Sequence, residues 1–157
     1  MRKNPASTLF LACLALTACG QPNAELEGAW TLDREAFIRD TVPVLREAGK
    51  IPEGAEAQAR RLLGRVKMEL EIEPDKSFSC RMSTATETSL FTGTWSRGGK
   101  HVTILQSHKD GEPEEDSMNE EDSMNGVLDG DTIRFEHDEE GLTVTYTLQR
   151  KSVAAPR

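Results

Sequence analysis

The chain has 157 residues, 36% of them hydrophobic and 29% charged, and its formal net charge is −8. This length suits one domain with one hydrophobic core. The acidic excess argues against nucleic acid as a partner, and it argues against electrostatic attachment to anionic phospholipid headgroups.

Residues 1–18 have the pattern of a secretory signal peptide. The start, Met1-Arg2-Lys3, is basic, residues 9–16 are largely apolar, and small residues precede Cys19. The apolar run is too short to span a bilayer, so a cleaved signal is expected rather than a membrane-spanning helix. Its removal takes away two basic residues and lowers the net charge from −8 to −10.

The segment Leu16-Thr17-Ala18-Cys19 resembles the lipobox of bacterial lipoproteins, in which cleavage before the Cys exposes a diacylated N-terminus. The resemblance implies that Cys19 carries diacylglycerol and palmitate-type chains, because one acyl chain alone binds a membrane only weakly. An ordinary secretory signal without acylation is the alternative, and Cys13 is a poorer attachment site. Gly20 replaces the Asp that retains such lipoproteins in the inner membrane, so the family pattern implies the outer membrane, facing the periplasm. Residues 19–25 would form a short acylated tether.

Two helices are expected after a first strand candidate at residues 25–32. Asp33 is a typical helix N-cap, and apolar residues at helical spacing then continue to Gly49, a typical helix stop. Pro43 within this stretch predicts a kink or a division into two pieces. A second helix is expected from residue 53 or 54 to residue 63.

From Arg65 onward, apolar and polar residues alternate with a period of two, as in strands that bury one face. The clearest case is the segment 66–72, in which apolar residues alternate with Lys and Glu. Turn signals separate the candidates, and Asp129-Gly130 is a typical hairpin turn. The candidates number about eight and are residues 25–32, 66–72, 78–82, 87–96, 100–107, 127–128, 133–136 and 142–148.

One apolar face on every strand predicts a mainly β fold with an antiparallel sheet. A single open sheet with two weakly amphipathic helices would expose a large apolar area. Closure into an up-and-down barrel of about eight strands buries that face and removes the sheet edges. We expect the barrel domain at residues 26–150, the two helices over its mouth, and a disordered tail at 151–157.

The segment Gly28-Ala29-Trp30, near the start of the first strand, is similar to the Gly-x-Trp opening of the lipocalins. The segments 91–104, 130–135 and 141–148 resemble the hairpins of small bacterial lipocalin-like (calycin) lipoproteins. A helical pair after the first strand is closer to the fatty-acid-binding proteins, although those have ten strands. Both families imply a small apolar ligand inside the barrel.

The inward-facing residues are the candidates for a ligand site. An eight-stranded barrel either fills its interior with side chains or holds one small ligand, and this sequence fits both outcomes. Val66 and Val102 share the inward face with the candidates, which are Met68, Leu70, Phe78, Cys80, Met82, Ile104, Phe135, Val144 and Tyr146. Cys80 is expected to be a buried, inert thiol. No intramolecular disulfide is expected, because Cys19 would be acylated.

An acidic segment separates two of the strand candidates. Residues 114–119 are repeated without change as 120–125, and eight carboxylates fall within residues 110–122. Carboxylate oxygens are ligands for calcium, but the glycine and the spacing of an EF-hand are absent. A disordered, solvated loop is the favoured interpretation of residues 114–125, and no metal site is expected.

The sequence offers no catalytic motif and no motif for a cofactor. His101, His108 and His137 share no metal-ligand spacing, and nucleophile elbows, phosphate loops and dinucleotide turns are missing. We therefore expect a lipid-anchored, non-enzymatic protein that binds a small apolar ligand in its barrel. The alternative is a protein with a filled barrel core that contacts a partner protein in the cell envelope.

Overall fold

The computed structural model describes residues 25–113, 123–139 and 141–152. The strands are β1 (Gly28–Leu32), β2 (Lys67–Ile72), β3 (Ser77–Ser83), β4 (Thr88–Gly98), β5 (His101–Lys109), β6 (Glu112–Pro113), β7 (Ser123–Asp129), β8 (Thr132–Glu139) and β9 (Leu142–Arg150), and the helices are α1 (Arg34–Glu47) and α2 (Glu56–Leu63). The predicted signal peptide 1–18, the predicted lipidation site Cys19 and its tether up to residue 24 lie outside the described residues.

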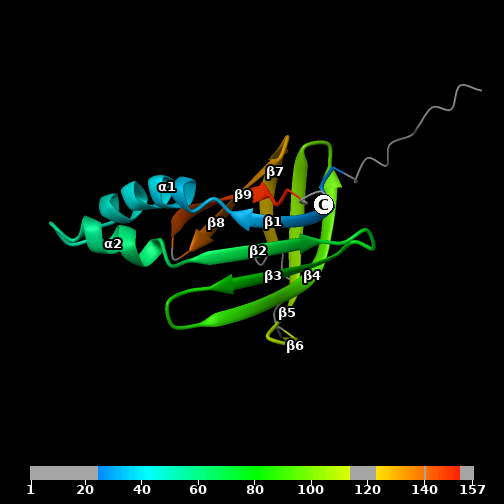
Figure 1. Ribbon diagram of the computed structural model, residues 1–157, viewed down its shortest axis with the longest axis horizontal. Helices are drawn as coiled ribbons and strands as arrows, with labels where there is room; N and C mark the ends of the chain where they lie inside the picture. The colour runs from blue at the N-terminus through cyan, green and yellow to red at the C-terminus, as the bar shows by residue number, and fades with distance from the viewer. Residues whose placement is uncertain (1–24, 114–122, 140, 153–157) are drawn as a thin grey trace, which may run out of the picture.

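Eight strands of the described chain close into an antiparallel barrel, as predicted. Each strand pairs with the next from β1 to β5, β5 pairs with β7, and the order continues through β8 to β9. β9 then pairs with β1, with Leu148 opposite Leu32, and this pairing closes the ring. β6 is an extra short strand that pairs with the last residues of β5. The prediction of an up-and-down barrel with two helices after its first strand is therefore confirmed (Figure 1).

The period of two in the sequence accounts for the barrel wall. Along β2, Met68, Leu70 and Ile72 are buried, whereas the Lys and Glu residues between them are exposed. The same alternation on the other strands directs one apolar row from each into the interior. Closure buries these rows against one another without a second sheet.

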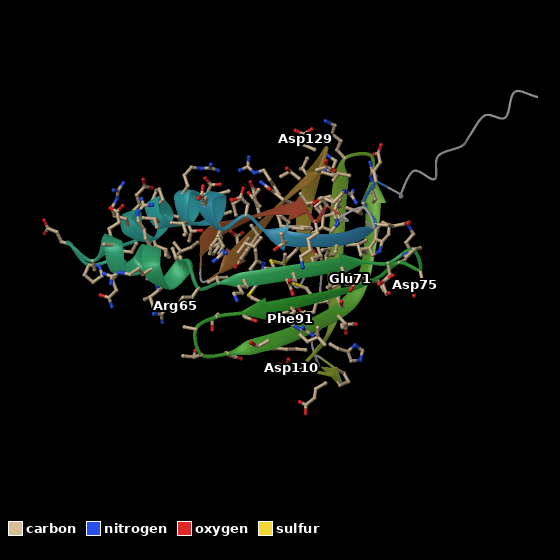
Figure 2. All side chains as sticks on the ribbon, viewed as in Figure 1. Arg65, Glu71, Asp75, Phe91, Asp110 and Asp129 are labelled. Carbon is tan, nitrogen blue, oxygen red and sulfur yellow. The ribbon has the colours of Figure 1, made fainter. Side chains whose placement is uncertain are left out.

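The barrel has two different ends, which the strand register identifies. The β2–β3, β4–β5 and β7–β8 turns meet at one end, together with the start of β1. We call this the tryptophan end, because Trp30 and Trp95 are buried near it and donate their indole N–H groups to the carbonyls of Leu26 and Glu73. The helices lie at the opposite end, which we call the helix end. In Figure 2, Asp75 in the β2–β3 turn marks the tryptophan end, and Arg65 beside α2 marks the helix end.

α1 begins where the sequence predicted. The Asp33 carboxylate accepts a hydrogen bond from the Ala36 backbone N–H at 3.0 Å, which caps the helix. The helix is continuous through Pro43, so the predicted alternative of two separate pieces is wrong. Burial of Phe37, which packs in the core, and of Val42 outweighs the cost of one proline in the helix. Among the described residues, no helix has the length and apolar character needed to span a membrane.

Two predicted boundaries differ from the structure. The acidic segment was expected to be a loop through residue 125, but β7 begins at Ser123, because Met124 packs against the core opposite Ile104. The rest of that segment, residues 114–122, lies outside the described residues. The tail was expected to begin at Lys151, but its N–H donates to the Ala29 carbonyl at 2.9 Å and its ammonium pairs with Glu69. Residues 153–157 lie outside the described residues.

Candidate functional site

A cavity of about 300 Å³ lies inside the barrel. Its lining comes from β2, β3, β4, β5, β7, β8 and β9. The innermost lining residues include Leu70, Phe78 and Ile104, which belong to the continuous hydrophobic core. Met82, Lys109 and His137 line it near the strand ends that lie furthest from the tryptophan end. The interior is thus filled at the tryptophan end and hollow toward the helix end.

The structure brings together seven of the nine residues that the sequence suggested for a ligand site. These seven line the cavity and are Met68, Leu70, Phe78, Cys80, Met82, Ile104 and Tyr146. Phe135 and Val144 are buried in the core but do not line the cavity. Phe135 packs directly over Gly126, where an added Cβ would lie only 2.5 Å from the phenylalanine ring. A glycine on β7 therefore leaves the space that the Phe135 ring fills.

Five further residues line the cavity that were not among the candidates. They are Phe91, Gln106, Lys109, Met124 and His137. Met124 was missed because it falls within the duplicated acidic segment. Gln106 and His137 continue the inward rows of Ile104 and Phe135, so the period of two already placed them inside, but their polarity argued for a position outside.

Lys109 lines the cavity because of a β-bulge between β4 and β5. Thr92 pairs with His108 while the next residue of β4, Gly93, pairs with Gln106, so Ser107 is an extra residue in β5. The alternation along β5 therefore shifts by one residue after Gln106. Lys109 comes to lie opposite Phe91, which also lines the cavity, whereas an unbroken period of two would have turned Lys109 outward.

Gly93 makes the bulge sterically possible. A Cβ at this position would lie 2.1 Å from the Leu105 carbonyl oxygen and 2.9 Å from the Phe78 ring. Only a glycine lets β4 and β5 approach this closely beside the bulge. The Ser107 hydroxyl also donates a hydrogen bond to the Thr92 carbonyl at 3.3 Å, which holds the extra residue against β4.

The helices support the cavity without lining it. Phe37 of α1 is buried and stacks on Tyr146, which is a lining residue of β9. α2 has no buried residues. Its last residue, Leu63, is partly buried and packs against the core. Both helices thus lie at the predicted end of the barrel, but neither contributes a lining residue to the cavity.

The chemistry of the lining is mainly apolar. Burial raises the pKa of the Cys80 thiol to about 12, so the thiol is protonated at neutral pH and is a poor nucleophile. The polar lining groups are the Gln106 amide, the Lys109 ammonium and the His137 imidazole. Within the described part of the chain, no group of His, Cys, Asp and Glu residues is arranged to hold a metal ion. The acidic residues 114–122, considered above for calcium, lie outside it.

A second hollow of about 620 Å³ lies over β5, β7 and β8. It contains exposed strand residues such as Asp129 and Val127, the latter 43% exposed, and it also carries the charged residues Arg134 and Glu136. It is larger than the interior cavity but is an open surface with mixed polar walls. The interior cavity, with apolar walls and few polar groups, has the usual character of a small-molecule site.

Comparison with known proteins finds similarity among solved structures. No family model matches the chain, and no curated protein matches it. Among solved structures, a chain described as "REP1-NXSQ fatty acid transporter" is similar with 13% sequence identity and a TM-score of 0.42. The similarity covers 83% of this chain and 99% of that one.

Proposed function

We propose that this protein is a lipid-anchored binding protein that carries a small apolar molecule in its barrel. The observation that carries the proposal is the interior cavity of about 300 Å³, which is lined by mainly apolar side chains from seven strands. Small-molecule sites have volumes from about 300 Å³ upward and are lined mainly by apolar residues with a few polar groups. The cavity lies at the lower limit of that range, which favours a ligand with one slender apolar chain.

The lining is well suited to a flexible apolar ligand. Met68, Met82 and Met124 come from three different strands and face the same cavity. Unbranched methionine side chains adapt to irregular shapes more readily than branched ones. Phe78 and Phe91 add flat apolar surfaces to the wall. The same walls offer no catalytic grouping, so we propose a binding role without chemistry on the ligand.

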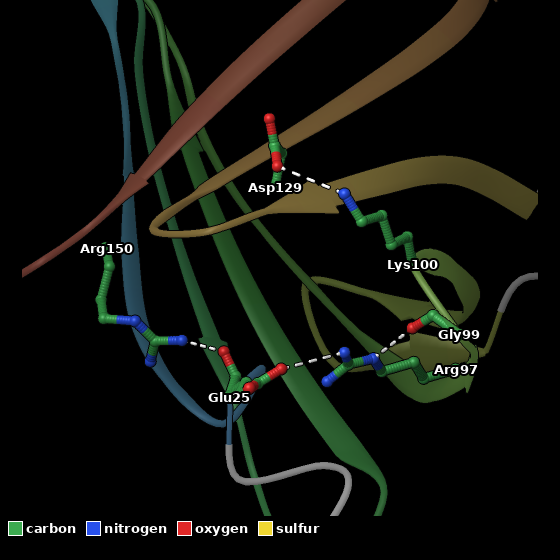
Figure 3. A network of polar contacts seen from close by, with 6 residues as sticks. All are labelled: Glu25, Arg97, Gly99, Lys100, Asp129 and Arg150. Atoms are coloured by element: carbon green, nitrogen blue, oxygen red, sulfur yellow. Dashed lines mark hydrogen bonds and ion pairs between the residues drawn. The ribbon is translucent and has the colours of Figure 1, made fainter.

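The anchor would set the direction in which the cavity opens. Glu25, the first described residue, lies at the tryptophan end, where Arg97 pairs with its carboxylate and Arg150 donates to its carbonyl (Figure 3). Cys19 is six residues earlier and can reach at most about 20 Å as extended chain. An acylated Cys19 would hold the tryptophan end toward the bilayer. Lys109 and His137, which line the cavity toward the helix end, would then face away from the bilayer.

Ligand binding is tested with the full chain carrying Cys19→Ser, which removes the acylation site. N-phenyl-1-naphthylamine is an uncharged dye that fluoresces when it enters an apolar cavity, and its titration reports occupancy. We expect saturable binding to this protein and its loss in Met82→Trp, because the larger side chain fills the cavity.

The matched control is Leu105→Trp, because Leu105 lies on the outer face of β5 and is 38% exposed. This variant should bind the dye as the parent protein does. Circular dichroism establishes that both variants keep the β fold. Absence of saturable binding in the parent protein, or equal binding by Met82→Trp, contradicts the proposal.

The anchor is tested separately in cells that process lipoproteins. Cys19→Ser should abolish incorporation of radiolabelled palmitate and cause uncleaved precursor to accumulate. Cys13→Ser serves as the control and should be processed normally. Normal cleavage and export of the Cys19→Ser protein would instead indicate an ordinary secretory signal.

A second candidate function is an accessory protein that contacts a partner in the cell envelope. The observation that favours it is the outer hollow over β5, β7 and β8, in which the apolar Val127 is exposed among charged residues. Crosslinking from residue 127 in intact cells, compared with crosslinking from residue 90 on β4, separates the two candidates. A specific adduct from residue 127 in a protein that fails to bind the dye would favour the accessory role.

A further inference from the structure

We infer that the ligand is a single-chain amphiphile with an anionic head group, which lies at Lys109. This inference rests on the proposed binding function and specifies the chemistry of the ligand. The mixed lining of the cavity motivates it, because apolar residues form the inner walls and a cation lies near the strand ends.

The position of Lys109 is built into the fold. The bulge at Ser107 turns the Lys109 side chain to the same face as Phe91, and its Nζ atom lies 5.9 Å from the centre of the Phe91 ring. The bulge in turn requires Gly93, where a Cβ would collide with the Leu105 carbonyl oxygen. Without the extra residue, the inward position would belong to the neighbouring His108. The fold thus places a long, basic side chain at the cavity.

Lys109 has no ion pair with any of the described residues. The carboxylate of the adjacent Asp110 accepts a hydrogen bond from the Leu90 backbone N–H at 2.8 Å. Glu112 lies directly opposite Lys109 across the β5–β6 ladder, so its carboxylate is on the same face. Glu112 is exposed and forms no ion pair with Lys109, so no carboxylate of the described residues neutralises the ammonium.

Two further hydrogen-bonding groups complete the polar part of the lining. Gln106 lies on β5 on the inner side of the bulge, and His137 comes from β8 across the barrel. An amide and an imidazole can each donate to an oxygen of a head group. A carboxylate at Lys109 could direct its alkyl chain inward along Met82 and Phe78, where apolar burial stabilises it.

The test compares decanoate with decanol in displacement of N-phenyl-1-naphthylamine from the full chain carrying Cys19→Ser. The two ligands share one chain length and differ in the charge of the head. Lys109→Gln should weaken decanoate binding roughly fivefold, the effect of a partly exposed ion pair, and leave decanol binding unchanged. Lys109→Arg keeps the charge and should keep decanoate affinity within about twofold. Added salt should weaken decanoate binding and not decanol binding.

Two matched variants sharpen the comparison. Lys67→Gln makes the same charge change at the same end of the barrel but on the outer face of β2, and it should affect neither ligand. Glu112→Gln removes the carboxylate opposite Lys109 and should strengthen decanoate binding about twofold, without an effect on decanol.

The outcomes separate this inference from the proposed function. If decanol and decanoate both bind, but Lys109→Gln or salt affects them equally, the anionic head is excluded and the apolar cavity stands. If neither ligand displaces the dye although the dye itself binds saturably, the inference is overturned and only the cavity remains. If the dye does not bind, both proposals fall together. The salt dependence is measured on the Cys19→Ser protein that keeps Lys109, so its result does not depend on whether a Lys109 variant folds.

Discussion

The ring of Phe37 on α1 stacks on the ring of Tyr146 on β9, with centroids 5.3 Å apart and planes inclined by 18°. Phe37 belongs to the hydrophobic core, and Tyr146 also lines the interior cavity. The stack therefore joins the first helix to the wall of the candidate site. It explains how a helix that contributes no lining residue still holds one side of the cavity in place.

Replacement of Phe37 by Ala should cost about 3–5 kcal/mol of unfolding free energy, because it removes a buried aromatic side chain and leaves a void behind Tyr146. Urea unfolding followed by circular dichroism measures this cost. Phe37→Leu, which keeps most of the apolar volume and loses the ring stack, should cost about 1–2 kcal/mol. Equal stability of the two variants would show that the void is not formed and that α1 closes over it.

Gly93→Ala should destabilise the barrel by more than about 3 kcal/mol, above the ordinary range for overpacking. The physical reason is the Leu105 carbonyl oxygen, 2.1 Å from the position of the new Cβ, which cannot move without separating β4 from β5. Gly98→Ala in the same strand is the control, because no atom lies within 4 Å of its new Cβ. That control should change stability by no more than about 0.5 kcal/mol. A mild effect of Gly93→Ala would mean that the strands can accommodate a side chain beside the bulge.

Cys80 should make the stability of the protein depend on pH in the alkaline range. Its pKa rises from 9.0 to about 12 on burial, so the folded protein holds the thiol proton more tightly than the unfolded chain does. This contribution is complete below pH 9 and is lost as the pH rises toward 12, by up to about 1.4 kcal/mol per pH unit.

Urea unfolding of the wild type and of Cys80→Ala, in the presence of reductant, measures this dependence. The stability advantage of the wild type should decrease steadily between pH 9 and pH 11. Parallel curves for the two proteins over that interval would show that the thiol is not desolvated. The thiol should also resist iodoacetamide at pH 8 until the protein unfolds.

Arg150 should fix the chain that enters the tryptophan end. Its guanidinium donates to the Glu27 carbonyl at 2.8 Å and to the Glu25 carbonyl, and it lies over the Trp30 ring at 4.3 Å. Arg150→Met should cost about 1–3 kcal/mol, because two backbone carbonyls, that of Glu27 partly buried, lose their charged donor.

Hydrogen exchange at residues 26–30 measures this effect locally, and it should become faster in Arg150→Met. Lys100→Gln is the control, since the Lys100 ammonium pairs with the exposed Asp129 carboxylate at 3.5 Å in the same region (Figure 3). It should leave both exchange and stability unchanged. Unchanged exchange in Arg150→Met would mean that Trp30 and Leu26 alone hold this segment.

The sequence predicted most of the fold because its main signals are local. The alternation in residues 66–72 predicted the buried face of β2, and Asp33, as the N-cap, predicted where α1 begins. These patterns depend on neighbours one to four positions away, which the chain itself supplies. The start of β7 escaped prediction because Met124 lies in a strongly acidic segment, and only its contact with the core makes that segment a strand.

The sequence by itself determined that the strands have one apolar face and that this face needs closure, since an open sheet would leave it in water. Only the tertiary structure decided which inward residues touch one another and which leave a space. Phe135 fills its part of the interior because Gly126 lies beneath it, whereas the space around Met82 stays open. Lys109 faces that space because one extra residue in β5 reverses the alternation, and a bulge is set by pairing with β4. Such pairing is a property of two strands together, and neither strand encodes it alone.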